Sequence, residues 1–217
     1  MPRDYKRRDT NDVSLYVSLF RALCVIITAG SRKTIVYEHS IPLGGNLPAG
    51  PKIFASNHPS NVDPAYFYHL MDNPALMIMD WGMNVPLVGP LMRECGFISV
   101  GKDGHAAYSL ALNALLSGRN VYICPEGKLS GPGTKPKTGA ARLAIQTGYP
   151  IIPIGIRHQG RIYSIPIGNG RFVKYMPFGE THITFGGPMY ARLAFGDTRR
   201  AHWMSERLMQ IIKVLSE

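Results

Sequence analysis

The sequence predicts one α/β domain, a single layered unit in which helices flank a mixed, largely parallel sheet. From residue 34 onward, strand-like and helix-like segments alternate along the chain. The 23 glycines and 17 prolines divide the chain into short elements. A length of 217 residues, with 45% hydrophobic and 18% charged residues, suits one folded domain with a sizeable core.

Each element is expected from a local pattern. Strands are expected at short apolar or alternating runs, with the last one at an edge of the sheet: 34–39, 52–56, 96–100, 120–127, 150–156 and 181–187. Helices are expected where the apolar spacing is helical, at 64–71, 105–118, 139–148 and 198–217. Pro64 suits a first helical turn, Gly118 and Gly148 suit helix ends, and Asp197 suits an N-cap.

The N-terminal segment differs from the rest of the chain. Residues 1–12 are polar and basic, and residues 13–29 are apolar except for four side chains. On a helix these four form one narrow polar stripe: Ser14, Ser18, Arg21 and Thr28. Arg32 and Lys33 follow, so both flanks are basic, and a helix lying in the interface of an anionic membrane fits best.

We therefore expect residues 1–33 to form a membrane-interface segment and residues 34–217 to form the domain. Three alternatives stay open from the sequence: the helix packs onto the core of the domain, spans a bilayer, or is a signal peptide. The apolar run is at the short limit for a span and carries Arg21 near its middle.

The overall charge points to an anionic partner. The net charge is +10 and the isoelectric point is about 9.7, which suits an acidic membrane surface or a phosphorylated ligand. The basic residues are scattered and no zinc-finger or RNA-binding pattern is present, so no nucleic-acid partner is expected. Cys24, Cys95 and Cys124 are an odd number without metal-ligand spacing, which fits a reducing compartment.

One short stretch, "NHPSNVDP" at 57–64, carries a candidate catalytic pair. It joins a predicted strand to a predicted helix, which is where ligands bind in open α/β sheets. With His58 in the loop and Asp63 in the first helical turn, the carboxylate can orient the ring and make it a general base. The spacing alone is weak evidence, because it often arises by chance, and on that evidence His58 as a turn residue and Asp63 as a helix-start residue would be preferred.

Three further blocks follow in order: "GFISVGK" at 96–102, "CPEGKLSG" at 124–131, and the stretch from "KTGAARLA" to "PIIPI" at 137–154. Together with "NHPSNVD" they resemble the 1-acylglycerol-3-phosphate acyltransferase family over about residues 52–156. The matching positions are Asn57, His58, Ser60 and Asp63 in the first block; Gly96, Ile98 and Lys102 in the second; Pro125, Glu126 and Gly127 in the third; and Lys137, Gly139 and Pro153 in the last.

The resemblance implies roles for specific residues. His58 would be the general base and Asp63 its partner. The substrate site would include Asn57, Ser60, Lys102, Glu126, Gly127 and Lys128, with no metal. Glu126 as a loop-holding carboxylate and Gly127 as a turn residue with positive φ are the alternatives.

Two positions depart from the family pattern. Leu129 stands where the family usually has an arginine thought to hold the phosphate of the acceptor, and Lys102 replaces another arginine. A lysine is a point charge and lacks the bidentate fork of arginine. Lysophosphatidate as the acceptor therefore does not follow from the resemblance.

The implied function is transfer of a fatty acyl group from acyl-CoA or acyl-carrier protein to a hydroxyl of a lysophospholipid or related lipid. The expected partners are that donor, the lysolipid acceptor and an anionic membrane surface, at the cytoplasmic face of a membrane, with peripheral or monotopic attachment. No cofactor beyond the donor substrate is expected. Two other classes stay open: a thiol-dependent acyl hydrolase that uses Cys124 and His58, and a non-catalytic lipid-binding protein.

Overall fold

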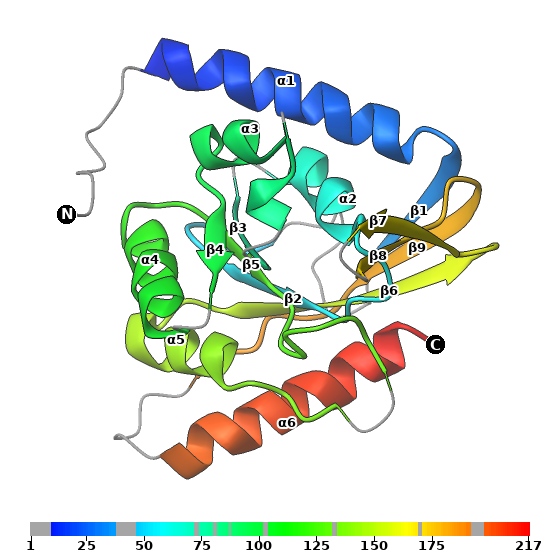
Figure 1. The fold of residues 1–217 in the computed structure, drawn as a ribbon. Helices are drawn as coiled ribbons and strands as arrows, with labels where there is room; N and C mark the ends of the chain where they lie inside the picture. The colour runs from blue at the N-terminus through cyan, green and yellow to red at the C-terminus, as the bar shows by residue number, and fades with distance from the viewer. Residues whose placement is uncertain are drawn as a thin grey trace.

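The computed structural model of the protein describes residues 10–37, 47–71, 74–79, 82–86, 88–101, 104–131, 134–168, 171–191 and 198–217. Within these residues, seven strands form the main sheet, in the order β1-β9-β6-β2-β5-β3-β4 (Figure 1). Their bounds are β1 (Ser31–Tyr37), β2 (Ile53–Ser56), β3 (Ala75–Met79), β4 (Ile98–Val100), β5 (Val121–Ile123), β6 (Ile151–Gln159) and β9 (Gly179–Phe185). Among the described strands of this sheet, β6 and β9 pair antiparallel and the other neighbours pair parallel, so the predicted mixed, largely parallel sheet is confirmed.

Helices cover both faces of the sheet. In chain order they are α1 (Thr10–Thr28), α2 (Asp63–Leu70), the short 3₁₀ turn η1 (Gly82–Asn84), α3 (Val88–Glu94), α4 (Gly104–Leu116), α5 (Gly139–Thr147) and α6 (Thr198–Leu215). Figure 1 shows α1, α2 and α3 on one side of the sheet, and α5 and α6 on the other. The expected helix end at Gly148 is confirmed: this residue follows α5 and adopts a left-handed φ of 74°. Asp197, the expected N-cap of the last helix, lies outside the described residues.

The two faces of the sheet have different cores. An aromatic core lies beneath α1, α2 and α3, where the Phe20 ring meets Tyr68 and Phe97 edge-on at centroid distances of 4.7 and 5.0 Å. An aliphatic core with many alanines lies beneath α4, α5 and α6 and includes Leu208 and Ile212. Small side chains allow these helices to pack closely on the sheet.

Several elements differ from the sequence prediction. The strand predicted at 181–187 was expected at an edge of the sheet, and this is wrong: the observed strand, β9 at Gly179–Phe185, lies between β1 and β6. β1 begins at Ser31, so the domain boundary placed after residue 33 falls inside a strand. The alternation in β9 reflects burial of one face and carries no information on which strands lie beside it. Five of the described elements were not predicted: β3, η1, α3, and the two-stranded ribbon of β7 (Tyr163–Gly168) and β8 (Arg171–Tyr175).

Helix α1 packs on the domain along one side and exposes apolar side chains along the other. Phe20 and Cys24 are buried, while Leu15, Leu19 and Ile26 are exposed. The polar stripe does not face solvent throughout. Thr28 is buried and donates to the Cys24 carbonyl, and Arg21 donates to the Met71 carbonyl at 3.1 Å. None of the helices among the described residues is both long and apolar enough to cross a bilayer.

The close contact of α6 with β6 gives a first prediction. A Cβ on Gly155 would lie 2.2 Å from the Leu215 carbonyl carbon, so Gly155→Ala must push the end of α6 off the sheet. We expect it to lower the free energy of unfolding by about 1–3 kcal/mol, as overpacking of a core does. Urea unfolding measures the change, and Gly101→Ala is the matched control because nothing lies within 4 Å of its added Cβ. Equal stability of the two variants would contradict this packing.

Candidate active site

The loop that carries the candidate base leaves the sheet directly after β2. β2 ends at Ser56, whereas its parallel neighbour β6 continues to Gln159. Beyond Ser56, the side chain of Asn57 makes the hydrogen bonds to β6 that a continuation of β2 would otherwise make. Its Nδ2 donates to the Ile156 carbonyl at 2.8 Å, and its Oδ1 accepts from the Ile156 N–H at 2.7 Å. Asn57 thus fixes the point at which the loop departs.

The loop and the first turn of α2 bring His58 and Asp63 together. Asp63 begins α2 and is fully buried. Its Oδ2 lies 3.0 Å from His58 Nδ1 and accepts the Ser60 backbone N–H at 2.8 Å. A ring nitrogen beside an ionised carboxylate holds the proton, so Nε2 of His58 carries the free lone pair. The predicted pair therefore has the geometry of a base and its orienting acid.

A second imidazole shares the same carboxylate. His158 Nε2 lies 2.9 Å from Asp63 Oδ1, and the His158 side chain is only 1% exposed. Its Nδ1 lies 3.0 Å from Thr181 Oγ1, which in turn lies 2.9 Å from Ser31 Oγ. His158 and Thr181 are directly paired across β6 and β9, so the register of these strands places both side chains on one face. Asp63 is thus held by a chain of buried polar groups that crosses three strands.

The loop after β5 fixes the main chain of His58. Ser130 binds it on both sides: the His58 N–H donates to Ser130 Oγ at 2.7 Å, and the Ser130 N–H donates to the His58 carbonyl at 2.8 Å. Ser130 Oγ donates in turn to the carboxylate of Glu126, which is almost fully buried. This loop needs Gly127, whose φ is 65° and whose added Cβ would lie 2.6 Å from the Lys137 side chain. The imidazole is therefore fixed through its backbone as well as its ring.

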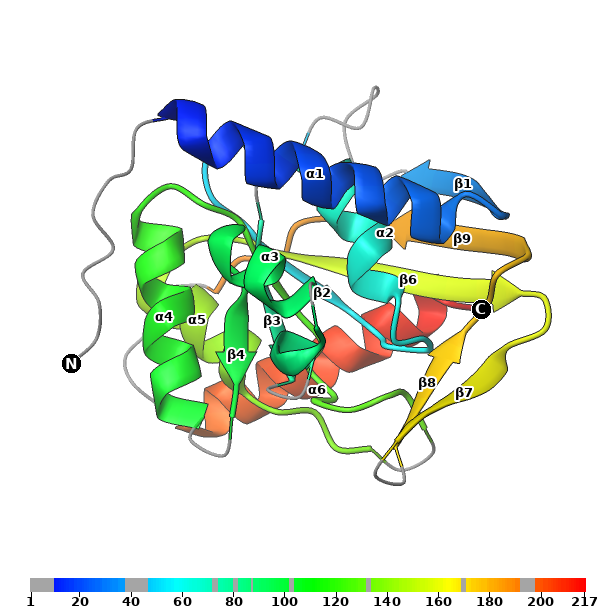
Figure 2. The ribbon, with the colours of Figure 1, turned by 45° about the horizontal axis from the view of Figure 1, so that its top comes forward.

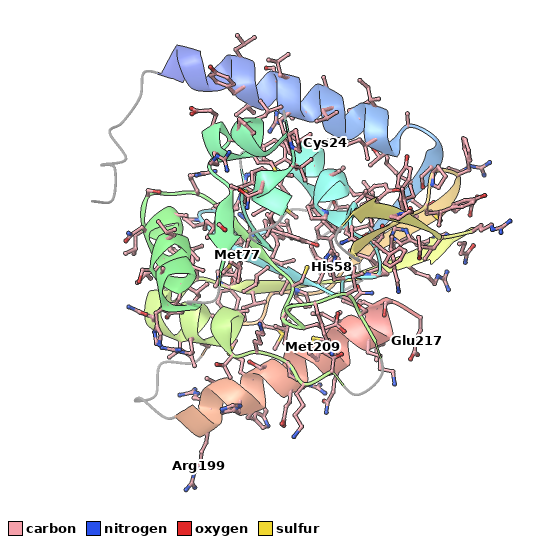
Figure 3. All side chains as sticks on the ribbon, viewed as in Figure 1. Cys24, His58, Met77, Arg199, Met209 and Glu217 are labelled. Carbon is pink, nitrogen blue, oxygen red and sulfur yellow. The ribbon has the colours of Figure 1, made fainter. Side chains whose placement is uncertain are left out.

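His58 borders a cavity of about 850 Å³. One part of its lining is apolar and comes from α1, η1, α3 and β3, and includes Phe20, Cys24 and Met77. Figure 3 labels Cys24 beneath α1, and Met77 and His58 below it near the middle of the molecule. The base therefore stands beside an apolar space with room for a hydrocarbon chain.

The other part of the cavity lining is basic. His105, Lys128, Lys137 and Arg142 line it, and the lining residues of the described chain include no carboxylate. The Arg142 guanidinium lies over the Tyr108 ring, 4.8 Å from its centroid. Leu129 also lines the cavity, so the hydrocarbon that replaces the usual arginine lies at the site itself. A basic lining of this kind suits a phosphate-bearing ligand.

A sequence profile described as acyltransferase matches residues 41–157. The chain belongs to this family. It is 25% identical over 154 residues to a 1-acyl-sn-glycerol-3-phosphate acyltransferase of Borreliella burgdorferi, an alignment that covers 68% of this chain and 57% of that protein. It is also 25% identical over 157 residues to a chloroplastic 1-acyl-sn-glycerol-3-phosphate acyltransferase of Brassica napus, with 69% and 44% covered. The matches thus span about half the length of these relatives.

A solved structure shares the fold. The crystal structure of the 1-acyl-sn-glycerophosphate acyltransferase PlsC of Thermotoga maritima superposes with a TM-score of 0.63 at 18% identity, and the alignment covers 97% of this chain and 82% of that one. The family resemblance inferred from the sequence motifs is confirmed by the profile and by these relatives.

The residues predicted from the family motifs have different places in the site. Asn57, Ser60 and Glu126 hold the loop: the Ser60 hydroxyl donates to the Lys174 carbonyl at 2.9 Å, and both Ser60 and Glu126 are buried. Lys128 lines the cavity beside His58. Lys102, the remaining predicted substrate residue, lies outside the described residues. The alternative reading of Glu126, a carboxylate that holds a loop, agrees with its contacts.

Sequence reasoning missed His158 and Ser130. Ser130 stands within the third motif block, where the family also has a serine, so the signal was present and not used. The predicted strand at 150–156 stopped two residues before His158, whereas β6 runs to Gln159. A histidine at the end of a buried strand was the available signal, but its partner depends on strand register, which one sequence does not display.

Substitution of His158 tests whether this side chain orients the Asp63–His58 pair or only fills space in the core. His158→Leu removes the donor to Asp63 Oδ1 and leaves the base less well oriented, so we expect kcat to fall about tenfold to a hundredfold, as for other residues that orient a ligand or base from behind. KM should change little, because His158 is outside the cavity lining. His158→Gln keeps an N–H donor and should recover most of the lost kcat. Equal activities of the Leu and Gln variants at equal stability would exclude this role.

Proposed function

We propose that the protein is a membrane-associated acyltransferase that moves a fatty acyl group from acyl-CoA or acyl-carrier protein to a hydroxyl of a lysophospholipid or related lipid. One observation carries the proposal: the His58–Asp63 pair, with its free Nε2 beside a cavity that is apolar in one part and basic in another. Family membership supports the reaction class. The site of attachment would be the cytoplasmic face of a membrane.

The chemistry is direct transfer. His58 Nε2 takes the proton of the acceptor hydroxyl while the oxygen attacks the thioester carbonyl of the donor. Asp63 stabilises the imidazolium that forms. The tetrahedral intermediate collapses, the new ester C–O bond remains, and the C–S bond breaks. The leaving thiolate takes the proton from His58, which returns the base to its starting state.

The cavity supports both substrates. Its apolar part, beneath α1 and against β3 and α3, suits a fatty chain. The Lys128, Lys137 and Arg142 side chains suit phosphate groups, which both donors and a phospholipid acceptor carry. Leu129 offers no bidentate donor to a phosphate monoester. We therefore favour an acceptor whose headgroup is larger or less charged than that of lysophosphatidate.

Substitution of the pair tests the proposal. We expect His58→Ala to abolish release of free thiol from the donor while donor binding persists, because the ring removes a proton and does not hold the ligand. Asp63→Asn should lower kcat by about 10²–10⁴-fold, since the base loses its orienting charge. The assay is thiol release from acyl-CoA and from acyl-carrier protein against a panel of lysolipids.

His202→Ala is the matched control, because His202 is an exposed histidine on α6. It should retain the full rate. Near-normal turnover in folded His58→Ala would remove the mechanism, and vesicle binding without thiol release by the wild type would favour a non-catalytic lipid-binding protein.

The thiol-hydrolase alternative is opposed by the environment of Cys124. Burial raises the pKa of Cys124 to about 12, so almost no thiolate is present near pH 7. The Cys124 sulfur lies 3.7 Å from the Tyr122 hydroxyl and 3.8 Å from Ser56 Oγ, both buried polar groups of the core. Cys124 thus has the character of a structural thiol beside the cavity.

Two measurements check this assignment. The rate at which iodoacetamide modifies Cys124 should stay low from pH 7 to 9 and rise only in more alkaline solution, because the thiolate fraction increases as the pH approaches a pKa of about 12. Cys124→Ala should lose no more than severalfold in acyl transfer, because the mechanism requires no thiol nucleophile. Loss of all turnover in a stable Cys124→Ala variant would support the thiol-dependent hydrolase instead.

A further inference from the structure

The ribbon of β7 and β8 stands apart from the main sheet and exposes apolar side chains. Its two strands pair antiparallel only with each other. Tyr163, Ile165 and Phe172 of the ribbon, and Ile162 directly before it, are each 40–57% exposed. A two-stranded ribbon has little stability of its own in water, and exposed apolar side chains make it less suited to solvent.

All the charged residues of the ribbon and its flanks are basic. Residues 160–178 contain Arg161, Arg171 and Lys174 and no aspartate or glutamate. The Arg161 guanidinium lies over the Tyr163 ring, 5.2 Å from its centroid. Basic groups beside tyrosine and aliphatic side chains are typical of segments that rest among anionic lipid headgroups.

The ribbon borders the same cavity as α1. Phe172 and Val173 of β8 line the cavity together with Phe20 and Ile27 of α1. The Tyr175 hydroxyl donates to the Ile27 carbonyl at 2.7 Å, which ties the base of the ribbon to the end of α1. In Figure 2, α1 runs along the upper side and the ribbon projects at the lower right, with α2 and α3 between them. Because α1 and the ribbon border one cavity, a membrane that covers that side of the molecule would touch both.

We propose that the β7–β8 ribbon is a second membrane contact, in which Ile162, Tyr163, Ile165 and Phe172 enter the headgroup region of an anionic bilayer and Arg161 and Lys174 meet its phosphates. This inference rests on the proposed function, because it assigns a further surface to a membrane-associated enzyme. A bilayer fits the ribbon through charge complementarity and through continuity with the exposed apolar side of α1.

The ribbon is also joined to the catalytic loop. The Lys174 carbonyl accepts the Asn61 N–H at 3.0 Å and the Ser60 hydroxyl at 2.9 Å, and the Lys174 N–H donates to Asn61 Oδ1 at 2.7 Å. Ser60 and Asn61 lie between His58 and Asp63 in the chain. The membrane contact therefore sets the height of the base above the lipid surface, where a lysolipid hydroxyl is presented.

The test is binding of the full chain to vesicles of phosphatidylcholine with about 30% phosphatidylglycerol. We expect the double variant Ile162→Ser/Ile165→Ser to bind about tenfold more weakly, because interfacial affinity scales with the apolar area inserted. Neither residue lines the cavity, so thiol release with a short-chain, water-soluble donor and acceptor should be unchanged. Trp203→Ser/Val214→Ser is the matched control on α6, with 66% and 69% exposure, and should bind as the wild type does.

Several outcomes would overturn the assignment. Vesicle binding by Ile162→Ser/Ile165→Ser with the affinity of the wild type would do so. If Leu15→Ser/Ile26→Ser then lost vesicle binding, α1 alone would be the membrane contact. Normal vesicle binding with lost affinity for isolated acyl-carrier protein would assign the ribbon to the donor protein. A wild-type dimer that the ribbon variant dissociates, measured by sedimentation velocity, would assign it to a second copy of the chain. Failure of the proposed function is detected separately, by turnover in His58→Ala.

Discussion

The buried carboxylate of Asp63 is the interaction on which the rest of the site depends. A carboxylate removed from water is costly unless donors surround it, and three reach this one: the Ser60 N–H and one ring nitrogen each from His58 and His158. These donors come from a loop after β2 and from the far end of β6. The fold must therefore hold both segments within hydrogen-bond distance of the start of α2.

The mixed sheet meets this requirement because its two kinds of pairing have different roles. The parallel strands end together and present the loops with His58 and Ser130 at one edge of the sheet. β6 continues beyond that edge because β9 returns antiparallel beside it and pairs with the extension. The amide of Asn57 pairs with the other side of the extension at Ile156. His158 thereby reaches Asp63 from outside the parallel part of the sheet.

The sequence predicted the part of the site that is local and missed the part that is not. His58 and Asp63 are five residues apart, so a loop and one helical turn suffice to join them. His158 meets Asp63 across 95 residues, through the register of two strands, and no local pattern encodes that register. The same limit explains why β9 was expected at an edge: its alternation shows only that one face is buried, and its neighbour β1 lies far away in the sequence. Residues 160–178, broken by glycine and proline, gave no strand signal of their own.

The ribbon is inserted between the two strands that carry His158 and Thr181. β6 leads into it and β9 leads out of it, and those strands pair with each other over six residue pairs, none of which includes a residue of the ribbon. The outer end of the ribbon can therefore change in length and composition during evolution while the register behind the catalytic aspartate stays the same. The Lys174 contacts limit this freedom to the part beyond the catalytic loop. Related enzymes in different membranes could thus vary how they touch lipid without rebuilding the chemistry.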